Sequence, residues 1–244
     1  MVAAIGAMVL LSVENKPKVL DEITLCIKDE SNPATLGIII DSTDAIPSAP
    51  AAKVYHLVTS AVAELPVNSR IQLFQIKGDS SFLEPLVDIC KPDDGADANQ
   101  FTSNPAYIKK TYEERFSTPL DKALRDLIEA EPQNSSPIIE GIQAASVKTL
   151  MPFQSASEKR LIIASDFLQH SNLYSMYRAK PDLSDFTNQT QTSSLGRIDL
   201  YGAKVDLLVI PRSIPQGNRS DLVTFWRDFL IQHNAALGSS LEPL

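Results

Sequence analysis

Five short apolar runs, separated by helical or polar segments, constrain the fold of this chain most strongly. Runs of this length, rich in aliphatic residues and bounded by turn signals, are typical of strands that are buried on both faces. The runs are LGIIID (36–41), RIQLFQIK (70–77), PLVDIC (85–90), RLIIASDF (160–167) and KVDLLVIP (204–211).

Helical patterns alternate with these apolar runs. They cover residues 51–65, 105–130 with an interruption at Pro119, 137–150 and 221–234, whereas 168–196 is polar and is expected to be a surface excursion. Strands that alternate with helices predict an α/β fold, a Rossmann-like doubly wound sheet that is mostly parallel. Because only a short turn at Gly78-Asp79 separates the second and third runs, we expect one antiparallel edge strand.

The length of 244 residues suits one large domain with short additions at its ends. We assign residues 1–12 to an apolar N-terminal segment, 13–35 to a linker, 36–236 to the domain and 237–244 to a tail. The segment MVAAIGAMVLLS is shorter than the ~20 apolar residues of a membrane span. Three alternatives stay open: part of a membrane anchor, a helix packed on the domain, or a weak export signal. Membrane association through this segment is one expectation, and the cellular location is left undecided.

Charge and motif content exclude several classes of protein. The formal net charge is −8 and the densest basic groups, Lys109-Lys110 and Lys159-Arg160, are single pairs, so we expect no nucleic-acid binding. The phosphate-binding pattern GxxxxGK[ST], the dinucleotide-binding pattern GxGxxG and the nucleophile pattern GxSxG are all absent. Cys26 and Cys90 are the two cysteines of the chain. They are either two free thiols or one disulfide, and a disulfide would tie the linker onto the sheet and indicate export.

Oxygen-bearing side chains gather where the strands end. Ligands of open α/β sheets collect at the carboxyl ends of the strands, which draws attention to Asp41, Thr43, Ser136 and Asp166. Carboxylates and hydroxyls suit Mg²⁺, with Mn²⁺ as a substitute, better than zinc. The alternative is structural, because Asp, Thr and Ser are also common helix caps.

These residues resemble the metal-ion-dependent adhesion site of von Willebrand factor A (vWA) domains. IIIDSTDA places Asp41 at the first aspartate and Thr43 at the first serine, while Ala45 at the second serine offers no ligand. NSSPIIEGI resembles the loop that carries the threonine, which aligns Ser136 (or Ser135), and IIASDF places Asp166 at the second aspartate. DSTDA, Cys90 and SPIIEGI are also similar to an uncharacterised group of bacterial vWA-like proteins.

The resemblance implies a protein–protein interaction module rather than an enzyme. A partner protein would place an acidic residue on the bound Mg²⁺, and Asp44, Tyr174, Tyr177 and Arg178 would add contacts beside the metal. The alternatives are a metal-free structural scaffold of a membrane-associated assembly and a Mg²⁺-dependent hydrolase that uses Asp41. His170, which follows Asp166 closely, is expected to be a surface residue.

Overall fold

The protein is described from a computed structural model over residues 19–28, 32–78, 84–96, 104–129 and 133–238. Within these residues, six strands form one sheet in the order β3-β2-β1-β4-β5-β6. The strands are β1 (Thr35–Asp41), β2 (Arg70–Ile76), β3 (Val87–Cys90), β4 (Lys159–Ser165), β5 (Lys204–Val209) and β6 (Ala236–Leu237). Neighbouring strands are parallel except β2 and β3, so the predicted α/β fold with one antiparallel edge strand is confirmed.

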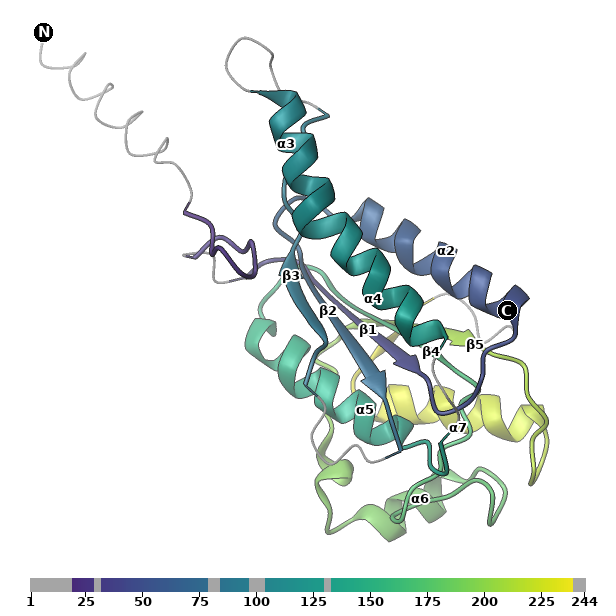
Figure 1. Cartoon of the computed structure of the whole chain (residues 1–244). Helices are drawn as coiled ribbons and strands as arrows, with labels where there is room; N and C mark the ends of the chain where they lie inside the picture. Colours follow the sequence, from purple (N-terminus) through teal and green to yellow (C-terminus); the bar gives the residue numbers. More distant parts are fainter. Residues whose placement is uncertain (1–18, 29–31, 79–83, 97–103, 130–132, 239–244) are drawn as a thin grey trace, which may run out of the picture.

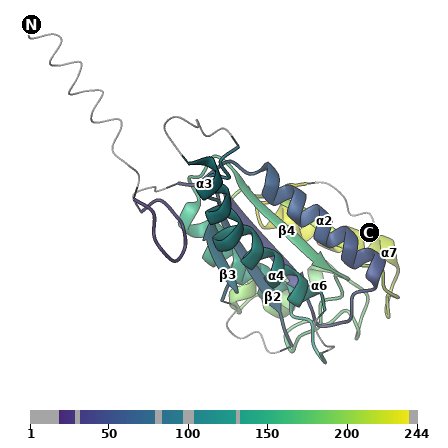
Figure 2. The same ribbon diagram turned by 45° about the horizontal axis from the view of Figure 1, so that its top comes forward.

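Helices cover both faces of this sheet. α2 and α4 lie on one face, and α5 and α7 lie on the other (Figure 1). The turned view of Figure 2 shows the same layering. The helices are α2 (Ser48–Glu64), α3 (Pro105–Tyr112), α4 (Thr118–Ile128), α5 (Ile138–Ala145), α6 (Leu183–Thr190) and α7 (Arg219–Gln232).

Alternation along β1 divides the core between the two faces. Leu36, Ile38 and Ile40 belong to the cluster beneath α2 and α4, whereas Ile39 belongs to the cluster with α5 and α7. Every side chain of β1 is buried, as expected for the central strand of a sheet with helices on both faces. This is why the run LGIIID is continuously apolar until Asp41.

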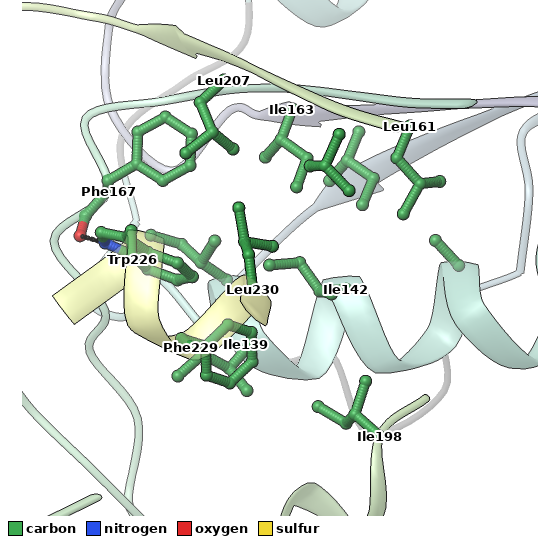
Figure 3. Close-up of a cluster of buried hydrophobic side chains, with 14 of the residues drawn as sticks. Ile139, Ile142, Leu161, Ile163, Phe167, Ile198, Leu207, Trp226, Phe229 and Leu230 are labelled. Atoms are coloured by element: carbon green, nitrogen blue, oxygen red, sulfur yellow. Dashed lines mark hydrogen bonds between the residues drawn. The ribbon is translucent and has the colours of Figure 1, made fainter. Parts of the chain in front are cut away.

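An aromatic contact fixes the chain just beyond β4. Phe167 packs edge-on against Trp226 of α7 with ring centroids 5.3 Å apart, and Trp226 Nε1 donates a hydrogen bond of 2.8 Å to the Phe167 carbonyl (Figure 3). Phe167 has a φ of 63°, a left-handed conformation that is rare for a bulky residue. Both groups are buried, so the core holds the backbone turn that immediately follows Asp166.

Two sequence predictions about helices need correction. The expected interruption at Pro119 is absent, because a wider π-helical turn (Glu113–Ser117) joins α3 to α4 and accommodates the proline ring. The polar stretch 168–196 is not only a surface excursion, since it contains α6, whose Phe186 is buried against Phe225 of α7.

The predicted linker includes a loop that is fixed to the edge of the sheet. Cys26 forms a disulfide with Cys90 of β3, and the Cys90 N–H donates to the Thr24 carbonyl at 2.7 Å. Residues 1–18 and 239–244 lie outside the described residues, so the predictions for the apolar segment and for most of the tail are not addressed. No helix that the described residues form is long and apolar enough to cross a membrane.

Candidate functional site

Asp41 joins three separate segments at the carboxyl ends of the central strands. Its Oδ1 accepts hydrogen bonds from the Thr43 N–H (3.1 Å) and from Thr43 Oγ1 (2.6 Å). Its Oδ2 accepts from Ser136 Oγ (2.8 Å) and from Ser165 Oγ (2.6 Å). The side chain is buried, so these four donors replace the water that a carboxylate would otherwise bind.

The structure therefore brings Thr43 and Ser136, two of the predicted ligands, into hydrogen-bond contact with Asp41. Ser135 turns away and donates to the Gly78 carbonyl instead. Ser165 also binds Asp41 and was not among the predicted site residues, although its position in the sequence indicates this contact. Ser165 is the last residue of β4, and the parallel register of β4 beside β1 carries it to Asp41.

Asp166, the second predicted aspartate, lies close enough to Asp41 for their charges to interact. Its Oδ1 accepts a hydrogen bond of 2.8 Å from the Leu168 N–H, and its Oδ2 forms an ion pair of 2.9 Å with Arg212 Nε. Burial first, and then the negative charge of Asp41, raise the pKa of Asp166 from 3.8 to about 6. Arg212 and the Leu168 N–H act in the opposite direction without cancelling that rise.

Arg212 is the site residue that the sequence analysis overlooked. It follows β5, and its guanidinium bridges two carboxylates, with Nε on Asp166 and Nη1 on Asp44 Oδ2 at 2.8 Å. The rule that polar residues beyond parallel strands meet at one edge would have found it, because Arg212 follows β5 as Asp166 follows β4. The side chain is 31% exposed, so part of the guanidinium faces solvent.

We tested whether these residues fit the expected Mg²⁺. The pocket between Asp41, Asp166 and Arg212 measures about 10 Å³, which is room for roughly one water molecule. Thr35 Oγ1 and His233 Nε2 are the buried side-chain polar atoms without a partner in the described part of the chain, and neither belongs to the site. Nor do the described residues contain a group of three His, Cys, Asp or Glu side chains that could hold a metal. Ala45, at the second serine position, offers no ligand, and every buried side-chain oxygen of the site already has a hydrogen-bond partner. In this arrangement the residues therefore do not fit a metal ion.

A larger pocket of about 430 Å³ lies beside this cluster. Ser136 connects the two, because its backbone exchanges hydrogen bonds of 2.9 and 2.8 Å with His170 while its side chain binds Asp41. His170 Nδ1 lies 2.8 Å from Ser175 Oγ, which orients the imidazole ring. The pocket is lined by Gly78, Asn134, Ser135, Pro137, Glu140, His170, Ser171, Asn172, Leu173 and Arg178.

The four residues predicted to contact a partner occupy different environments. Tyr174 is buried, its ring packs on Phe186 and its hydroxyl bonds the backbone of Asp182, so it is a core residue. Arg178 is exposed and lines the pocket, and Tyr177 is 39% exposed with its ring 5.0 Å from that of His170. Asp44 is bound to Arg212.

We call the surface formed by residues 42–47, 133–137, 166–182 and 210–218 the carboxyl-end face. It lies where the parallel strands end and includes both pockets just described. Comparison of the sequence with models of known protein families gave no match, and comparison with curated proteins gave no significant relative. The site is therefore interpreted from its own chemistry.

Proposed function

We propose that the protein is a protein–protein interaction module that binds an acidic segment of a partner on its carboxyl-end face. The observation that carries this proposal is the 430 Å³ pocket with Arg178 and His170 in its lining. Amide, hydroxyl and guanidinium donors around a pocket suit a carboxylate side chain. The resemblance of the strand-end residues to those of vWA domains supports the same face and the same kind of ligand.

The sign of the charge at this pocket favours an acidic partner. The chain carries a net charge of −8, and Arg178 is the arginine of this pocket lining. Glu140 is the acidic residue of the pocket lining, and its Oε2 accepts a hydrogen bond of 2.9 Å from Gln169 Nε2. Arg178 is left as the charged donor at the surface, and complementary charges increase both association rate and specificity.

Exposed apolar side chains lie beside the charged ones. Leu173 in the pocket lining is 44% exposed, and Tyr177 presents an aromatic ring beside His170. Burial first, and then the nearby charges of Asp166 and Asp44, raise the pKa of Tyr177, so this ring lies near the aspartates as well as beside His170. Tyrosine and arginine are enriched in protein interfaces, so Tyr177 and Arg178 are residue types that suit this contact.

The disulfide indicates where the module works. Disulfides persist in oxidising compartments and are rare in the cytosol, so we place the domain outside the cytoplasm. The hydrolase alternative gains no support, because Asp41 is buried and both of its oxygens already accept two hydrogen bonds. The expected Mg²⁺ ion does not fit the site residues as they are arranged, and the next subsection gives the metal titration that tests this.

Site-specific photo-crosslinking in cells that naturally produce the protein tests this proposal. A photoreactive residue replaces Leu173 on the carboxyl-end face or, as the matched control, Val67, which is 58% exposed just before β2 at the opposite end of the sheet. We expect position 173 to capture one defined protein and position 67 not to capture it.

Charge reversal then tests the chemistry of the contact. Arg178→Glu should reduce the yield of that crosslink at least about tenfold, since a hydrogen bond to a charged group contributes about 1.5–3 kcal/mol. Arg197→Glu, at an exposed arginine near the start of β5, is the control and should leave the yield unchanged. Equal capture from positions 67 and 173, or full capture by Arg178→Glu, would refute docking at this face.

A further inference from the structure

Arg212 supplies a positive charge at the place where the sequence predicts a metal. Its guanidinium lines the pocket that Asp41 and Asp166 also line, and it forms ion pairs with Asp166 and Asp44. Asp166 is buried, and a buried carboxylate is stable only when donors or cations surround it. Arg212 and the Leu168 N–H provide those partners without any ion.

Asp41 is satisfied in a different way. Four protein donors, three of them hydroxyls, occupy its two oxygens, so the carboxylate is held without a cation. Each of these hydroxyls uses its one proton for Asp41, and none is left as a buried atom without a partner. The cluster is therefore complete as a set of protein groups.

We propose that the Arg212 guanidinium replaces the divalent cation at this site, so that the carboxyl-end face functions without metal. This inference deepens the proposed docking function, because it makes the partner's acidic segment meet a fixed arginine instead of a bound ion. Nε and Nη1 hold the guanidinium on Asp166 and Asp44, and the side chain is 31% exposed, so a partner carboxylate can reach the guanidinium from solvent. A planar guanidinium with two of its nitrogens fixed is already oriented for such a pair.

The replacement has a consequence that can be measured. A metal ion that reaches Asp166 must displace Arg212, and the two cations repel each other at this distance. Removing the guanidinium while keeping the carboxylates and hydroxyls leaves an oxygen-rich pocket without a positive charge. Arg212→Gln should therefore create the metal affinity that the wild-type protein lacks.

The experiment titrates the full-length protein with Mn²⁺, using calorimetry for the heat of binding and electron paramagnetic resonance for free Mn²⁺. We expect no saturable binding by the wild type at millimolar Mn²⁺, and binding at least about tenfold tighter by Arg212→Gln. Arg197→Gln, which removes an exposed arginine near the start of β5, is the matched control and should behave as wild type. Arg212→Gln combined with Asp166→Asn should lose the new binding, which would place the ion at Asp166.

Two results would overturn the inference. Wild-type protein that binds Mn²⁺ as tightly as Arg212→Gln would show that Arg212 does not occupy the cation position. An Arg212→Gln variant that folds, as judged by circular dichroism, but binds no Mn²⁺ would show that the arginine replaces nothing. Neither result depends on the partner, so the crosslinking experiment can succeed or fail independently.

Discussion

The disulfide gives the sharpest prediction of stability. Cys26 and Cys90 are 64 residues apart in the sequence, and the loop that they close contains β1, α2 and β2. Closing a loop of this length removes conformational entropy from the unfolded chain, which corresponds to about 4 kcal/mol at 25 °C. Because domains are stable by only about 5–15 kcal/mol, loss of the disulfide should be a large effect.

Other contacts in the described part of the chain also hold the loop that carries Cys26. Leu25 is buried, the Ile27 N–H donates to Asn68 Oδ1 at 3.2 Å, and Thr24 pairs with the backbone of Cys90. After reduction of the disulfide, the loop stays docked only if these contacts outweigh the conformational entropy that the loop gains on release. The full 4 kcal/mol is therefore an upper value, and about 2–4 kcal/mol is expected.

Urea unfolding with and without a reductant measures this loss. Trp226 is the single tryptophan and is buried in the core, so its fluorescence reports global unfolding. The control is Cys26→Ser with Cys90→Ala, whose stability should be low and should not respond to the reductant. A decrease of less than about 1 kcal/mol in the free energy of unfolding of the wild type on reduction would contradict the prediction. It would mean that the loop detaches in the reduced native state, so that the disulfide restrains the folded chain as well as the unfolded one.

Three further predictions concern buried positions. Asp41→Ala should cost about 3 kcal/mol or more in urea unfolding, because three buried hydroxyls and one N–H lose their acceptor. Burial lowers the pKa of His233 below 6.5, so stability should be retained above pH 6.5 and lost as the pH falls below it. The pH dependence should weaken in His233→Gln and persist when the exposed His56 is replaced by Gln. Gly141→Ala should lower the melting temperature although alanine favours helices, since its Cβ would lie 2.9 Å from Ile76 Cγ1; a rise would contradict this packing.

The strands and the edge of the sheet that carries the site could be read from the sequence because local pattern determines them. An apolar run predicts a buried strand, and the polar residue at its end predicts the point where the chain leaves the core. Asp41 and Asp166 follow from this rule, and Ser136 follows from the start of α5. No long-range information was needed to bring these residues to one edge.

The parts that the sequence did not reveal depend on side-chain direction and on pairing. Tyr174 looked like an interface residue by type, but its ring enters the core beside Phe186 because that segment folds back onto α7. The choice between free thiols and a disulfide for Cys26 depended on whether the preceding segment reaches β3, which composition alone cannot decide. Arg212 was not predicted because a metal site calls for acidic and hydroxyl side chains, and a basic residue is not a metal ligand.

The pKa of Asp166 argues that this cluster is more than a helix cap. A carboxyl whose pKa rises from 3.8 to about 6 on folding makes the folded state lose stability as the pH rises through 6, by about 3 kcal/mol in order of magnitude. An asparagine or serine would accept the Leu168 N–H without that cost. A buried carboxylate that destabilises the fold is typical of a functional site. Here the Asp166 carboxylate positions the Arg212 guanidinium at the surface. Because Asp41 also holds the fold together, we expect substitutions at Arg212 and Arg178 to change the proposed binding without unfolding the domain.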